Sequence, residues 1–81
     1  IAFGMGVASN YAAGLYRLRV TDGPAGGLAE LLVNGGQKAI ILTYLDAEGD
    51  GEVVDPVPGG MQRGDTVAIR INGVVVKQWV H

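Results

Sequence analysis

The pattern of hydrophobic and polar positions is clearest at the C-terminal end of the chain. Two β-rich runs, residues 66–71 and 74–81, flank Asn72-Gly73. Both central positions of a type I′ turn need positive φ, which Asn and Gly tolerate better than other residues. The pattern therefore predicts a β-hairpin with a two-residue loop.

A two-residue loop sets which residues face each other across this hairpin. Ile71 is expected opposite Val74, and Ile69 opposite Val76, so that one face is aliphatic. The other face is then mixed, and it carries Arg70, Lys77, Trp79 and His81. On this register Trp79 lies on the opposite side of the sheet from Ile69.

Five earlier segments also have the composition and spacing of strands. They are residues 1–8, 15–21, 28–33, 38–45 and 52–55, and turn residues separate them. In the second segment, Tyr16, Leu18 and Val20 are expected to point inward. Residues 39–45 are apolar on both faces, which is typical of a central strand covered on two sides.

Residues 28–33 allow two interpretations. Asn34-Gly35-Gly36, which follows them, suits the C-cap of a short helix and equally the loop of a second hairpin. We favour a strand, because the segment is short for a helix and the next segment is strongly β-forming. A three-residue loop matches the apolar faces of the two strands better than a two-residue loop does.

Seven short strands at regular spacing, with turn signals between them, predict an all-β fold. A small antiparallel β-sandwich is the expected architecture, and a small β-barrel is the alternative. Residues 1–81 are expected to form one domain, because a chain of this length supports a single small core.

Three groups of turn residues support a more specific expectation. They are Val33-Asn34-Gly35, Asp50-Gly51, and Gly64-Asp65-Thr66-Val67 together with Asn72-Gly73-Val74. Over residues 28–81 this layout resembles the immunoglobulin-like modules of bacterial secreted and cell-surface proteins. The resemblance implies an extracellular spacer, adhesive unit or sugar-binding unit.

Composition excludes several classes of function. The chain has no cysteine and one histidine, which rules out disulfides and the usual zinc sites. Its formal net charge is −2 and its six basic residues are scattered, so nucleic acid is not an expected partner. The longest apolar run, residues 39–42, is too short for membrane insertion. Ser9 is the only serine and His81 is terminal, so no catalytic nucleophile–base set is evident and the chain is not expected to be an enzyme.

An acidic loop is the clearest candidate for binding chemistry. Its acids are Asp46, Glu48 and Asp50, at positions 1, 3 and 5, with Gly51 at position 6. The spacing resembles the calcium loops of EF-hands and dockerins, where carboxylates surround a hard cation. Val57 stands where those loops have a bidentate acid, so Asp55 is the expected substitute ligand. The alternative is a solvated turn that binds no ion. Calcium is the one cofactor that the sequence suggests.

The N-terminal segment alternates large and small residues. The large ones, Ile1, Phe3, Met5 and Val7, fall on one side of a strand. Residues 1–8 are expected either to join this domain's own sheet or to be exchanged with a neighbouring subunit by strand addition.

Two hypotheses for function follow. The first is a non-catalytic extracellular or cell-surface structural subunit that self-associates through strand edges into an oligomer or filament. The second is an accessory module of a larger protein that binds carbohydrate or calcium, with Trp79, Arg70 and His81 contacting a polysaccharide or another partner. The tripeptide Arg63-Gly64-Asp65 spells an integrin-type motif, but it is expected to be a turn before a strand.

Overall fold

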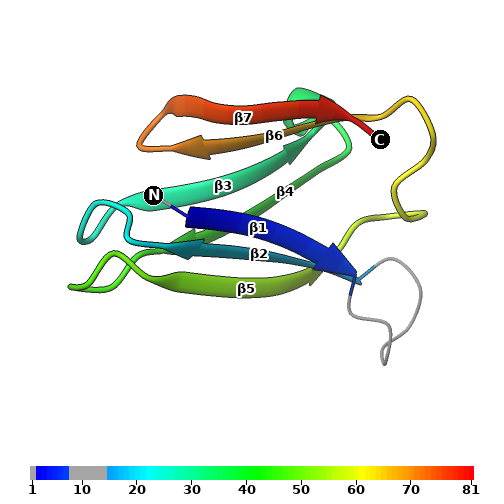
Figure 1. Ribbon diagram of the computed structural model, residues 1–81. Helices are drawn as coiled ribbons and strands as arrows, with labels where there is room; N and C mark the ends of the chain where they lie inside the picture. Colours follow the sequence, from blue (N-terminus) through cyan, green and yellow to red (C-terminus); the bar gives the residue numbers. More distant parts are fainter. Residues whose placement is uncertain (1, 8–14) are drawn as a thin grey trace.

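The alternating segments form two packed antiparallel sheets (Figure 1). The computed structural model describes residues 2–7 and 15–81, with side chains described for 15–81. Sheet A has the strand order β1-β2-β5, and sheet B has the order β4-β3-β6-β7. The seven strands are β1 (Ala2–Val7), β2 (Leu15–Thr21), β3 (Leu28–Val33), β4 (Ala39–Tyr44), β5 (Gly51–Pro56), β6 (Thr66–Ile71) and β7 (Val74–Val80). The predicted all-β sandwich is confirmed.

The core lies between the two sheets and follows the period of two along each strand. Tyr16, Leu18 and Val20 of β2 are buried, as predicted from their alternation with exposed arginines. The facing sheet contributes alternate residues of its two central strands and of β4: Ala29, Leu31, Val33, Ile41, Val67, Ile69 and Ile71. Val57 and Met61, from the connection between β5 and β6, close one end of this core.

Residues 28–33 form a strand, which settles the choice between strand and helix. The predicted three-residue loop after it is wrong, because Val33 pairs with Ala39 and five residues connect the strands. The loop contains a 3-10 turn, η1 (Asn34–Gly36), and all three of its residues have positive φ. The loop is closed by a hydrogen bond in which the backbone N–H of Lys38 donates to the carbonyl of Val33.

The prediction of a covered, central strand at residues 39–45 is also wrong. β4 is an edge strand of sheet B, and only β3 pairs with it in the described part of the chain. Its inward residue Ile41 is buried, whereas its outward residues Ile40, Leu42 and Tyr44 are exposed. A strand with apolar residues on both of its faces can be a central strand covered on two sides. It can equally be an edge strand whose outer face is apolar and exposed.

The register of the C-terminal hairpin differs from the prediction beyond the turn. Ile71 pairs with Val74, as expected, but a β-bulge then places Ile69 opposite Lys77 and Val67 opposite Trp79. The extra residue on β7 moves every later side chain to the other face. Trp79 therefore lies on the same side as Ile69 and packs, partly buried, against the core. Burial of its large ring is the physical gain from the bulge.

β1 pairs with β2 of the same chain at one edge of sheet A. Phe3 is in register with Val20, Met5 with Leu18 and Val7 with Tyr16, while Ile1 lies outside the described residues. An exchanged strand would make the same pairing with the β2 of another copy. Strand exchange therefore stays a prediction.

One buried hydrogen bond links β2 to the connection before β6. The backbone N–H of Met61 donates to the hydroxyl of Tyr16 over 2.8 Å. We predict that Tyr16→Phe lowers the free energy of unfolding by about 1–3 kcal/mol, because it leaves this N–H buried without an acceptor. Urea unfolding measures the change. Tyr44→Phe, at a side chain that is 70% exposed, is the matched control, and equal losses in both variants would contradict the prediction.

Candidate functional site

The acidic loop lies between β4 and β5 and is built around Asp46. One carboxylate oxygen of Asp46 accepts the backbone N–H groups of Glu48 and Asp50, both over 2.9 Å. Gly49 has φ of 81°, and a Cβ at this position would lie 1.9 Å from the carbonyl oxygen of Gly23. The loop therefore requires glycine there, and it packs directly against the turn that follows β2.

The side chains of Asp46, Glu48 and Asp50 are exposed, and their carboxylate oxygens lie within 4.8 Å of one another. They are close enough together to share one cation. A shallow hollow of about 260 Å³ adjoins Asp46 and Asp50 and is bordered by Arg19 and Glu52. The same oxygens also act within the fold, since Asp50 accepts the backbone N–H of Asp22 over 3.1 Å.

Asp55 does not belong to this group, and its prediction as a substitute ligand is corrected. It pairs with Tyr16 at the far end of β5, whereas Gly51 next to the loop pairs with Val20. Four residues of extended strand separate Asp55 from the loop, about 13 Å. The group of three acids lacks the fourth protein carboxylate that the sequence assigned to it.

The calcium hypothesis makes a clear prediction for this loop. Millimolar calcium would raise the midpoint of thermal unfolding of the natural sequence, because the ion binds the folded loop alone. Asp50→Asn would abolish the increase while keeping an acceptor for the Asp22 N–H. Asp55→Asn, which removes an acid of β5 outside the loop, would keep the increase. An unchanged midpoint of thermal unfolding would contradict calcium binding, and the loop would then be a hydrogen-bonded turn that binds no ion.

The residues expected to form a ligand-binding face are separated by the β7 bulge. Trp79 lies on the inner side of sheet B, with the Lys77 ammonium 5.2 Å from the centroid of its ring. His81 is exposed at the end of the chain, where its backbone bonds to residues 64 and 65. Arg70 lies on the outer face. Trp79, Arg70 and His81 therefore do not form one site, and carbohydrate binding stays a prediction for Trp79 alone.

Arg70 has a partner that the sequence did not reveal. Its Nε and Nη2 atoms donate to the two carboxylate oxygens of Glu30, over 3.0 and 2.8 Å. The hydrogen bonds and negative charge of Glu30 raise the pKa of Arg70 above its usual value. Glu30 is the one charged residue among the buried residues of the described chain. Only the pairing of β3 with β6, at a separation of 40 residues, brings the two together.

Asp65 joins two connections at one end of the sandwich, the loop after β3 and the segment between β5 and β6. Its carboxylate accepts Lys38 Nζ over 2.6 Å, the backbone N–H of Gln62 over 2.8 Å and Asn34 Nδ2 over 3.1 Å. The Lys38 bond is the main reason that the pKa of Asp65 is lowered to about 2. This acid of the Arg63-Gly64-Asp65 tripeptide is thus occupied within the fold, as expected of a structural turn.

The lowered pKa of Asp65 predicts acid sensitivity. In the unfolded chain its pKa is near 3.8, so its contribution to stability is fully present above about pH 4 and is lost as the pH falls toward 2. Asp65→Asn is expected to lower stability at pH 7 and to flatten the decrease between pH 4 and pH 2. Urea unfolding at several pH values measures this, with Asp55→Asn as the control. An unchanged slope in Asp65→Asn would contradict it.

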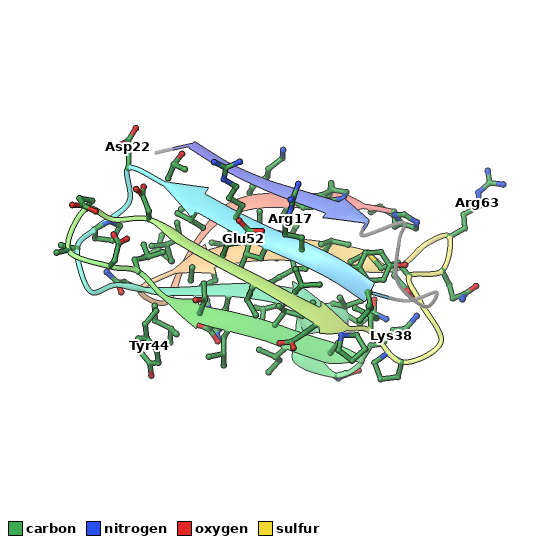
Figure 2. The ribbon with its side chains drawn as sticks, turned by 90° about the horizontal axis from the view of Figure 1, so that it is seen from below. Arg17, Asp22, Lys38, Tyr44, Glu52 and Arg63 are labelled. Atoms are coloured by element: carbon green, nitrogen blue, oxygen red, sulfur yellow. The ribbon has the colours of Figure 1, made fainter. Side chains whose placement is uncertain are left out.

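Exposed apolar side chains gather on the outer face of sheet B. The register places β4 residues 40, 42 and 44 on this side, next to Leu28, Glu30 and Leu32 of β3. The largest exposed residues there are Ile40 at 51%, Leu42 at 45%, Tyr44 at 70%, Val75 at 50% and Val80 at 66%. Figure 2 shows Tyr44 extending from β4 away from the body of the molecule. The two-sided apolar run of residues 39–45 was the sequence signal for this surface.

Comparisons with protein family models, with curated proteins and with solved structures gave no match. No helix in the described part of the chain is long and apolar enough to cross a membrane.

Proposed function

We propose that this protein is a non-catalytic structural module that associates with copies of itself through the strand edges of its β-sandwich. The observation that carries the proposal is the exposed apolar side of β4, formed by Ile40, Leu42 and Tyr44. Three large apolar side chains in a row on an edge strand are a liability in a protein that stays monomeric. Pairing of this edge with a second copy places these side chains beside apolar neighbours and lowers their exposure to water.

The electrostatics of the surrounding surface support a partner of the same kind. Along the outer face of sheet B, whose four strands are all described, Glu30 and Arg70 are the only charged residues. They neutralise each other through two hydrogen bonds. An edge strand in neutral, apolar surroundings suits a second one, because neither copy brings an unpaired charge to the contact.

The size of the chain supports the same proposal. A domain of 81 residues without cysteine has a small core and no covalent cross-links. Burial of further apolar surface between copies stabilises each of them by roughly 25 cal/mol per Å². The extracellular or cell-surface location implied by the sequence resemblance is part of the proposal, and it suits a module whose role is mechanical or adhesive.

Mass in solution tests the proposal. The natural sequence is expected to show a mass that rises with concentration in sedimentation or light scattering. Leu42→Lys should shift it toward monomer, because a charge then enters the apolar contact. Val54→Lys, on the outer face of sheet A and 39% exposed in the natural chain, is the control and should associate normally. A natural chain that stays monomeric at every concentration would refute self-association.

A further inference from the structure

The free edge of β4 presents an ordered row of backbone groups. In antiparallel sheets, alternate residues of a strand bond to the neighbour on one side and to the neighbour on the other. The N–H of Leu45 donates to the carbonyl of Gly27, which continues the β3–β4 register by one pair. Odd-numbered residues of β4 therefore bond to β3. The N–H and C=O groups of Ile40 and Leu42 and the N–H of Tyr44 point to the free edge. The carbonyl of Tyr44 accepts the hydroxyl of Thr43 over 3.5 Å and lies beside Gly51.

Other strand edges carry features that discourage pairing. β5 has Glu52, Asp55 and a terminal Pro56, and β7 has its bulge followed by Lys77. Charges, proline and bulges are the means by which edge strands avoid pairing with other chains. β1 includes two glycines, which weaken a strand. β4, with the sequence Ala-Ile-Ile-Leu-Thr-Tyr, has none of these features.

We infer that two copies of this protein pair β4 with β4, antiparallel, about a two-fold axis through Leu42. This inference rests on the proposed self-association and names its geometry. The axis places Leu42 opposite Leu42 of the second copy and Ile40 opposite Tyr44. Of the antiparallel registers, this one matches all three edge residues with one another. Both backbone groups of Leu42 then bond across the axis, and the N–H of Tyr44 reaches the carbonyl of Ile40 in the second copy.

The pairing joins the two four-stranded sheets into one continuous sheet of eight strands. The side chains that are exposed on β4 become cross-strand neighbours on the outer face, where apolar pairs stabilise a sheet. The two-fold relation makes the contact isologous, so it closes at a dimer. Because the contact is only about 20 Å long, the length of one strand, we expect a dimer that dissociates on dilution.

Single cysteines test the register, since the natural chain contains none. Directly opposite residues in a hydrogen-bonded antiparallel pair have Cα atoms about 5.5 Å apart, within the range that a disulfide spans. Leu42→Cys alone should therefore form a covalent dimer under mild oxidation. Ile40→Cys alone and Tyr44→Cys alone should not, because each lies about 13 Å from its own copy. A mixture of these two variants should cross-link.

The outcomes separate the inference from the function on which it rests. Rapid dimerisation of Leu42→Cys, with cross-linking of the mixed pair, supports the two-fold register. Equal cross-linking of Ile40→Cys alone, or none by any variant while the natural chain still associates, overturns the register but leaves self-association standing. A natural chain that never associates removes both.

Leu42→Pro provides an independent test of the backbone contact. Proline removes the N–H that points to the free edge and leaves the bonds between β3 and β4 in place. It should weaken dimerisation by at least about tenfold relative to Leu42→Ala, which removes the side chain but keeps the N–H. Circular dichroism of both monomers checks that the sandwich is intact. Equal dimerisation of the two folded variants would overturn the inference.

Discussion

The pairing of β3 with β6 is the interaction on which the rest of the structure depends. Five residue pairs, from Ala29–Ile71 to Val33–Val67, join segments that are about half the chain apart. On the inner side, this pairing places Leu31 beside Ile69 in the core. On the outer side, it aligns Glu30 with Arg70 and so pairs their charges. Because β3 and β6 occupy the centre of sheet B, β4 and β7 are left as its edges.

The two edge strands of sheet B, β7 and β4, differ in the residues that govern pairing with another chain. At β7, the extra residue at the bulge turns Trp79 into the core, and Lys77 follows the bulge. Those features reduce the capacity of β7 to pair with another chain. At β4, the strand is regular and uncharged, and its outer side chains are apolar. This asymmetry is the physical basis for proposing β4 as the edge that pairs with a second copy.

Polar contacts order the two ends of the sandwich. At one end, Asp65 connects the loop after β3 with the start of β6 through Lys38 and Asn34. At the other end, the acidic loop bonds to its own backbone and to the turn after β2. Residues that a sequence search would assign to an integrin motif and a calcium loop thus have structural roles in the folded chain. Such roles are expected when turn chemistry and ligand chemistry use the same residue types.

Local chemistry was sufficient to place every strand to within about two residues, because alternation and turn residues act over a few positions. The Asn72-Gly73 turn, the strand at residues 28–33 and the inward side of β2 were all predictable in this way. Strand order was not, because it depends on contacts between distant segments. An apolar run such as residues 39–45 suits a covered strand and an exposed edge equally well. The side of Trp79 was decided by a single extra residue in β7, whose energetic gain exists only when a core is present to receive the ring.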